Sequence, residues 1–126
     1  MPRLSPDRRD AILESVKVLK PAAVYLFGSY GTDRQHPGSD LDLAILTSTP
    51  LDPVELFELG NHLAERLHLE VDLVDLDRAS TVMRKEVLRT GERLQAADLS
   101  AARQFEMLAL SDYARLNEER AEILAR

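Results

Sequence analysis

Two aspartates separated by one residue stand at the start of an apolar segment in the first half of the chain. Asp40 and Asp42 precede the run Leu43-Ala44-Ile45-Leu46, and such a run is typical of a buried strand. Successive side chains of a strand alternate between its two faces, so residues i and i+2 project to the same side. The spacing therefore predicts two carboxylates close together, and two such like charges repel each other.

A divalent cation between the two carboxylates would remove this repulsion. Mg²⁺ is the natural candidate, because it takes carboxylate oxygens and completes its coordination with water and substrate phosphates. The competing interpretation is a solvated pair at a strand end, since an Asp-x-Asp pattern by itself is common. Two further features of the sequence favour the cation.

The first feature is a Gly-Ser pair that directly follows the apolar run of residues 22–27. Gly28 would allow a close backbone approach, and the Ser29 hydroxyl together with free backbone N–H groups could hold a phosphate. A lone Gly-Ser is most often a simple turn. Here ten residues separate it from Asp40, and the combination with the Asp-x-Asp pattern is far more specific.

The second feature is an aspartate inside a later apolar segment, "EVDLVDL" at residues 70–76. Charged residues are seldom buried without a partner, so Asp72 is expected to complete a three-carboxylate cluster with Asp40 and Asp42. Asp75 would point to the opposite face of the same strand. It remains the alternative third carboxylate, although a place at the strand end is the simpler interpretation.

Capping residues and hydrophobic periodicity predict the elements that position these side chains. The expected order is a helix from Ser5 to Pro21, strands at 22–27 and 41–46, a helix after Asp52, a strand at 70–76, a helix from Ser80 to about Arg89 that stops at Gly91, a short edge segment at 94–96, and a last helix after Asp98. This order predicts an α+β fold in which helices flank a small mixed sheet. We expect a single domain, with residues 1–97 as its body and 98–126 as a C-terminal helix.

The predicted last helix carries apolar residues on more than one side. Ala102, Phe105, Ala109, Tyr113 and Leu116 form one stripe, and Met107, Leu110 and Ala114 form a second. A surface helix needs one apolar face, so the second stripe indicates either a partner or a fully covered helix. The preceding helix contributes three basic residues, interpreted as surface charge or alternatively as contacts to a partner or nucleotide: Arg84, Lys85 and Arg89.

Composition excludes several classes of function. The 126 residues include no cysteine, which excludes disulfides, a thiol nucleophile and a cysteine-based zinc site. Residues 40–77 hold ten acidic residues and one basic residue, and no basic stripe suited to direct nucleic-acid binding is visible. The N-terminal segment lacks the apolar run of a signal peptide, and no apolar run reaches bilayer length. We therefore expect a cytoplasmic protein without a membrane anchor.

The motif order resembles that of a known enzyme family. Gly28-Ser29, the ten-residue spacer, Asp40-x-Asp42 and the later Asp72 resemble the minimal nucleotidyltransferases of the DNA polymerase β-like superfamily, over about residues 8–95. The tail from residue 98 is similar to that of the MntA-type antitoxins. These small proteins are paired with HEPN-domain ribonuclease toxins.

The resemblance implies a polymerase β-like nucleotidyltransferase fold and a chemistry. It implies Mg²⁺-dependent transfer of AMP from ATP to a tyrosine hydroxyl of a partner HEPN toxin, which is thereby silenced. Gly28 and Ser29 would cradle the β- and γ-phosphates. Asp40, Asp42 and Asp72 would bind the metal, and Asp72 would also help to deprotonate the hydroxyl. The antitoxin and its toxin would form a hetero-oligomer.

One position departs from the family pattern. Many relatives carry Gly-Ser-x-Ala-Arg-Gly, whereas Thr32 stands here at the usual arginine position. Arg34 lies two residues further on and is the candidate substitute at the phosphates. Two alternatives stay open beside the protein adenylyltransferase. One is a non-catalytic antitoxin that neutralises its toxin by direct binding, and the other is a small-molecule nucleotidyltransferase.

Overall fold

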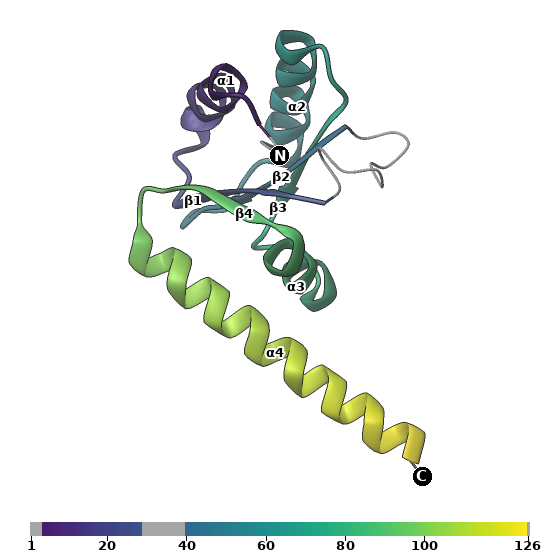
Figure 1. Cartoon of the computed structure of the whole chain (residues 1–126). Helices are drawn as coiled ribbons and strands as arrows, with labels where there is room; N and C mark the ends of the chain where they lie inside the picture. The colour runs from purple at the N-terminus through teal and green to yellow at the C-terminus, as the bar shows by residue number, and fades with distance from the viewer. Residues whose placement is uncertain (1–3, 29–39, 126) are drawn as a thin grey trace.

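The computed structural model describes residues 4–28 and 40–125 of the chain (Figure 1). Its elements in chain order are α1 (Pro6–Val16), the 3-10 turn η1 (Lys17–Leu19), β1 (Ala23–Phe27), β2 (Leu41–Leu46), α2 (Pro53–Leu67), β3 (Val71–Asp75), α3 (Thr81–Thr90), β4 (Glu92–Ala96) and α4 (Leu99–Ala125). The predicted order of helices and strands is confirmed.

The strands form a mixed sheet with the order β3-β2-β1-β4. β1 pairs antiparallel with β2 and with β4, whereas β2 and β3 run parallel. Parallel neighbours need a crossover connection, and α2 supplies it between β2 and β3. The predicted α+β class with a small mixed sheet is therefore confirmed, and β3 and β4 are the edge strands.

Helices cover both faces of this sheet, and each face has its own apolar core. In Figure 1, α1 and α2 lie on one side of the strands, and α3 and α4 lie on the other. Alternation along the strands divides the side chains between the two layers: Val24 and Leu26 pack with α1 and α2, while Tyr25 and Phe27 face α3 and α4. Each strand face thus has a defined set of neighbours.

The predicted helix starts are confirmed by side-chain caps. The N-terminal hydrogen bonds run from Arg8 N to Ser5 Oγ (3.2 Å), from Val54 N to Asp52 Oδ1 (3.0 Å), from Met83 N to Ser80 Oγ (3.1 Å) and from Ala101 N to Asp98 Oδ1 (3.0 Å). Each cap satisfies an amide that has no partner inside its own helix. These local signals explain why the helix boundaries could be predicted.

Gly91 follows α3 as predicted, but the reason for a glycine there is space rather than backbone conformation. Its φ of −94° is open to any residue, and it is not the left-handed cap that often ends a helix. A Cβ atom at Gly91 would lie 2.0 Å from the Val87 carbonyl oxygen and 3.1 Å from that of Leu26. The glycine therefore allows the end of α3 to lie directly against β1.

A polar contact fixes α4 to the sheet. The buried Tyr25 of β1 donates its hydroxyl proton to Glu106 of α4 over 2.7 Å, and Arg93 of β4 pairs with the same carboxylate at 2.8 Å. Burial, and then the neighbouring Glu106 carboxylate, raise the pKa of the Tyr25 hydroxyl well above its usual value. We refer to Tyr25, Arg93 and Glu106 as the α4 latch.

Beyond this latch α4 leaves the body of the molecule. Ala102 and Ala109 of α4 are buried, whereas every described residue from Asn117 to Ala125 is exposed. Figure 1 shows this end of α4 projecting away from the sheet. Across the part of the chain that the structure describes, no helix combines the length and the apolar character needed to cross a bilayer.

Candidate active site

Two of the predicted carboxylates occupy directly paired positions on neighbouring strands. The parallel register aligns Asp42 of β2 with Asp72 of β3. Paired residues on adjacent strands project to the same face, here the one that α3 and α4 cover. Asp75 pairs instead with Ile45 and lies on the opposite face. Of the two alternatives for the further carboxylate, Asp72 therefore shares a face with Asp42.

The two paired carboxylates differ in exposure. Asp42 is 8% exposed. Among the residues that the structure describes, it is the only buried residue with a charged side chain. Asp72 is exposed, in contrast to the expectation from its apolar surroundings in the sequence. The physical reason is that β3 is an edge strand, so that one side of Asp72 has no neighbouring strand. The site thus has one deep and one accessible carboxylate.

Gly28 lies directly against the buried carboxylate. It follows β1, and the register places Asp42 opposite Phe27, the last residue of that strand. The φ of Gly28 is +78°, in the region that favours glycine, and a Cβ atom there would approach Asp42 Oδ2 to 2.5 Å. Both its conformation and its surroundings therefore require a glycine at this turn.

Asp40 is placed differently from the expectation of a three-carboxylate cluster. It lies one residue before β2, and its Oδ2 accepts a hydrogen bond from the Glu70 amide over 3.0 Å. The amides of Asp40 and Leu41 both donate to the Glu70 carbonyl, each over 3.0 Å. Within residues 4–28 and 40–125, no three His, Cys, Asp or Glu side chains gather closely enough to hold a metal ion. The structure shows Asp42 and Asp72 at paired strand positions, with Asp40 directly before the start of β2.

This arrangement is still compatible with Mg²⁺ by the chemistry of its donors. Carboxylate oxygens are hard ligands, and Mg²⁺ is commonly held by one or two of them together with substrate phosphates and water. Asp42 and Asp72 supply two carboxylates on one face, beside a turn whose glycine leaves room for a close approach. The residues present therefore fit this ion.

Two residues of the predicted phosphate site, Ser29 and Arg34, lie outside the described residues. Thr32, which stands at the usual arginine position, lies outside them too. Gly28 is therefore the part of the predicted Gly-Ser turn that the structure places.

Thr90, which the sequence analysis did not single out, contacts the turn. Its Oγ1 accepts a hydrogen bond from the Gly28 amide over 3.1 Å and donates one to the Glu86 carbonyl over 2.8 Å. The two partners are 62 residues apart in sequence, and no local pattern connects them. A threonine in the last turn of a helix is common, so the sequence offered no signal for this contact.

The three basic residues of α3 make contacts within the protein. Arg84 donates to the Leu76 carbonyl over 2.9 Å, and Lys85 lies 4.8 Å from the centre of the Tyr113 ring. Arg89 pairs with Glu86, and this hydrogen bond holds the pKa of the Glu86 carboxyl below its usual value. These contacts tie α3 to β3, to α4 and to itself.

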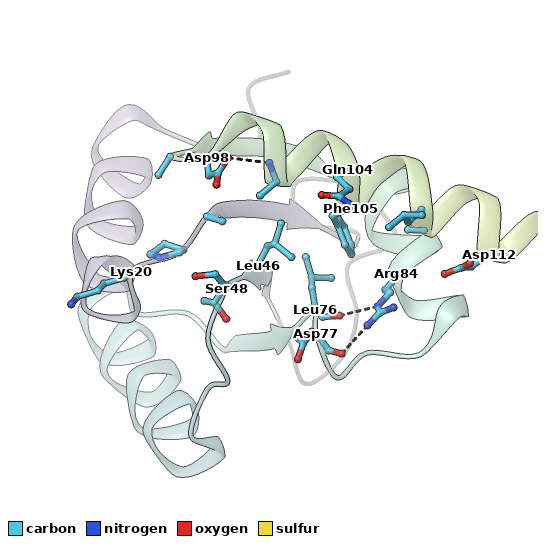
Figure 2. A pocket seen from close by; sticks show the side chains of 17 residues that line it. Lys20, Leu46, Ser48, Leu76, Asp77, Arg84, Asp98, Gln104, Phe105 and Asp112 are labelled. Atoms are coloured by element: carbon cyan, nitrogen blue, oxygen red, sulfur yellow. Dashed lines mark hydrogen bonds between the residues drawn. The ribbon is translucent and has the colours of Figure 1, made fainter.

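A pocket of about 490 Å³ lies at the other end of the sheet from the carboxylates. Leu46, Leu76, Phe105 and Arg84 line it, and Figure 2 shows the Arg84 guanidinium donating hydrogen bonds to the backbone carbonyls of Leu76 and Asp77. None of Gly28, Asp40, Asp42 or Asp72 contributes to this lining. The pocket is therefore separate from the candidate active site.

The sequence matches the model of a known protein family. Residues 11–99 match the family model described as polymerase beta, nucleotidyltransferase. The chain belongs to this nucleotidyltransferase family. The predicted fold family and the predicted enzyme class are thereby confirmed.

Relatives of this chain carry a more specific name. The chain is 40% identical over 101 residues to the protein adenylyltransferase MntA of Shewanella oneidensis. The aligned region covers 80% of this chain and 72% of that protein. It is also 36% identical over 55 residues to a putative protein adenylyltransferase of Methanocaldococcus jannaschii, covering 44% of this chain and 56% of that protein. The predicted similarity to MntA-type antitoxins is confirmed.

Solved structures of toxin–antitoxin pairs have the same fold. A crystal structure of a toxin–antitoxin with AMP-PNP contains a chain that matches with a TM-score of 0.79 and 35% identity, over 93% of this chain and 95% of that one. A complex of the MNT antitoxin with the tri-AMPylated HEPN toxin of Shewanella oneidensis matches with a TM-score of 0.78 and 33% identity, over 94% and 93% of the two chains. Nearly the whole length of the present chain is thus shared with these proteins.

Proposed function

We propose that this nucleotidyltransferase is a protein adenylyltransferase and an antitoxin. It transfers AMP from ATP to a tyrosine hydroxyl of a partner HEPN-domain ribonuclease toxin, with Mg²⁺ as cofactor. The observation that carries the proposal is the aligned pair Asp42 and Asp72 beside the Gly28 turn. The names of the relatives support the choice of AMP as the transferred group and of a toxin as the acceptor.

Each predicted residue has a role in this proposal. Gly28 and Ser29 hold the β- and γ-phosphates of ATP, and Arg34 replaces the arginine that many relatives carry in the loop. Asp42 and Asp72 hold the metal, and Asp40 adds its charge from the edge of the pair. When bound, Mg²⁺ neutralises phosphate charge and stabilises an in-line displacement.

Asp72 is suited to accept the proton of the attacking hydroxyl. The tyrosine oxygen forms a bond to the α-phosphorus, and the bond from that phosphorus to the pyrophosphate oxygen breaks. Pyrophosphate leaves, and the hydroxyl proton passes to the Asp72 carboxylate. Because Asp72 is exposed on an edge strand, a side chain of another protein can reach it. The buried Asp42 is not accessible in this way.

The C-terminal helix is proposed to bind the partner. Its outer stripe consists of Met107, Leu110, Ala114, Asn117, Ala121 and Leu124, all of them exposed. Their alternating spacing of three and four residues is typical of a helix that packs lengthwise on another helix. Residues 98–126 would thus join antitoxin and toxin into a hetero-oligomer, while residues 1–97 carry the active site.

The test is the intact mass of the purified toxin after incubation with this protein, ATP and Mg²⁺. We expect one or more added AMP units with the wild type and none with Asp42→Asn. Asp75→Asn is the matched control, because it removes the same charge from the opposite face of the sheet. An unchanged toxin mass with the folded wild-type protein would refute the proposed transfer.

A second candidate function is neutralisation by binding alone, which the exposed stripe of α4 favours. In that case Asp42→Asn would still form a stable complex with the toxin and suppress its ribonuclease activity. The same preparations therefore separate the two functions: transfer predicts loss of neutralisation in Asp42→Asn, and binding alone predicts that it is retained.

A further inference from the structure

We infer that Thr90 is a positioning residue for nucleotide binding, which it supports through the Gly28 turn without touching the substrate. The inference rests on the proposed function, because it assigns Thr90 a task at the proposed phosphate site. It concerns the end of α3, an element that none of the predicted site residues belongs to.

The hydroxyl of Thr90 has a fixed orientation. It carries one proton, and this proton is donated to the Glu86 carbonyl within α3 over 2.8 Å. A lone pair of the same oxygen then accepts the Gly28 amide over 3.1 Å. The helix thereby holds the acceptor in place before any ligand arrives, so the direction of the Gly28 N–H is set by the protein itself.

The position of α3 that makes this contact is itself constrained. Gly91, the next residue, lies so close to the Leu26 carbonyl that a Cβ atom would be 3.1 Å away. Thr90 and Gly91 therefore bring the end of α3 against the last residues of β1 at two successive points. The end of α3 cannot move away from Gly28 without also moving the start of β4 at Glu92.

The Gly28 turn is the part of the site that most needs such support. The φ of Gly28 is +78°, and glycine adopts positive and negative φ values about equally readily. Without support, the turn would therefore sample other backbone conformations. The same turn lies against the Asp42 carboxylate. Holding the Gly28 amide therefore fixes both the proposed phosphate cradle and the space above a metal-binding carboxylate.

The experiment compares three variants of the full chain. Thr90→Val keeps the shape of the side chain and removes the hydroxyl, whereas Thr90→Ser keeps the hydroxyl and removes the methyl group. Thr47→Val is the matched control, since the Thr47 hydroxyl donates to the Thr49 carbonyl over 2.7 Å at the other end of the sheet. Affinity for AMP-PNP with Mg²⁺ is measured by calorimetry, and exchange of the Gly28 amide by NMR.

We expect Thr90→Val to weaken AMP-PNP binding about five- to tenfold, the scale of one lost hydrogen bond, and to speed exchange of the Gly28 amide. The KM for ATP should rise by the same factor, with kcat at saturating ATP within about twofold of the wild type. Thr90→Ser should restore both affinity and amide protection. Thr47→Val should match the wild type in both measurements.

Two results would overturn the inference. One is wild-type affinity in a folded Thr90→Val. The other is a Thr90→Ser as weak as Thr90→Val, which would assign the effect to packing of the methyl group. Failure of the wild type to bind AMP-PNP would instead refute the proposed function, and it would also refute the role of Thr90 in nucleotide binding. The wild-type titration thus distinguishes the two failures.

Discussion

At the scale of single residues, the candidate site depends on the contact between Gly28 and Asp42. The turn passes so close to the buried carboxylate that a Cβ atom would lie 2.5 Å from its oxygen. Gly60 offers a contrast, because a Cβ atom there would meet the Leu73 side chain at 3.8 Å, an ordinary contact distance. The two glycines therefore allow a controlled test of the turn.

Gly28→Ala is expected to destabilise the protein by about 2–4 kcal/mol, since it adds a left-handed alanine and a steric clash with Asp42. We also expect AMP transfer to fall at least about tenfold, because the carboxylate must move. Urea unfolding and the toxin mass assay measure the two effects. Gly60→Ala lies inside α2 and should be neutral or stabilising by about 1 kcal/mol. Equal stabilities for the two variants would contradict this account.

The faces of the strand that carries Asp72 were predictable from the sequence, but the exposure and the contacts of the candidate site residues were not. Strand periodicity placed Asp72 and Asp75 on opposite faces, and the register agrees, since it aligns Asp72 with Asp42 and Asp75 with Ile45. Which strand forms the edge depends on pairings between distant segments, so the exposure of Asp72 could not be predicted. The hydrogen bond from the Glu70 amide to Asp40 depends on the same pairing.

At the scale of elements, the α4 latch joins β1 to two elements from the end of the chain, β4 and α4. Tyr25 and Glu106 are 81 residues apart, and no local sequence pattern predicts their contact. The helix starts, in contrast, follow from side chains within three residues of the cap and were predicted correctly. Local chemistry therefore gave the elements, and non-local packing determined how α4 is held.

Tyr25→Phe is expected to lower the free energy of unfolding by about 1–2 kcal/mol at neutral pH, through loss of the buried hydrogen bond to Glu106. The raised pKa means that the folded protein keeps this proton after the unfolded chain has released it. The stabilising contribution is thus complete below pH 10.0, the ordinary value, and is lost as the pH rises further. Urea unfolding between pH 7 and 11 measures both effects.

The matched comparison is the difference in unfolding free energy between wild type and Tyr25→Phe at each pH. This difference cancels the titration of the other tyrosines and of the lysines. It should be constant at neutral pH and shrink above about pH 10. A difference that stays constant or grows up to pH 11 would contradict a raised pKa of the Tyr25 hydroxyl in the folded protein.

At the scale of the whole molecule, catalysis and partner binding are proposed at separate places. Asp42 and Asp72 lie at paired positions of β2 and β3, whereas the C-terminal end of α4 projects away from the sheet (Figure 1). Residues 40–77, which contain the carboxylates, hold ten acidic residues and one basic residue. We therefore expect that the two activities can be impaired one at a time.

Leu110→Glu places a charge in the middle of the outer stripe, where Leu110 is 54% exposed. We expect the affinity for the toxin to fall at least about tenfold, because an interface centre tolerates an unpaired charge poorly. AMP-PNP binding should be unchanged. Calorimetric titration with toxin and with AMP-PNP measures the two affinities separately.

Val54→Glu is the control for this charge, because Val54 is an equally accessible apolar residue, 62% exposed, in the first turn of α2. A glutamate near a helix N-terminus is well tolerated. Toxin binding should therefore be retained. Loss of toxin affinity in Val54→Glu but not in Leu110→Glu would move the proposed interface from α4 to α2.

One helix stands between these two regions. α3 holds the Gly28 amide through Thr90 at its end, and along its side Lys85 rests on the Tyr113 ring of α4. A partner that shifts α4 would act on the turn through α3, and a ligand at the turn would act on α4 in return. By thermodynamic reciprocity, the factor by which toxin changes affinity for nucleotide is also the factor by which nucleotide changes affinity for toxin. The affinity of such an antitoxin for its toxin would then depend on the nucleotide concentration in the cell.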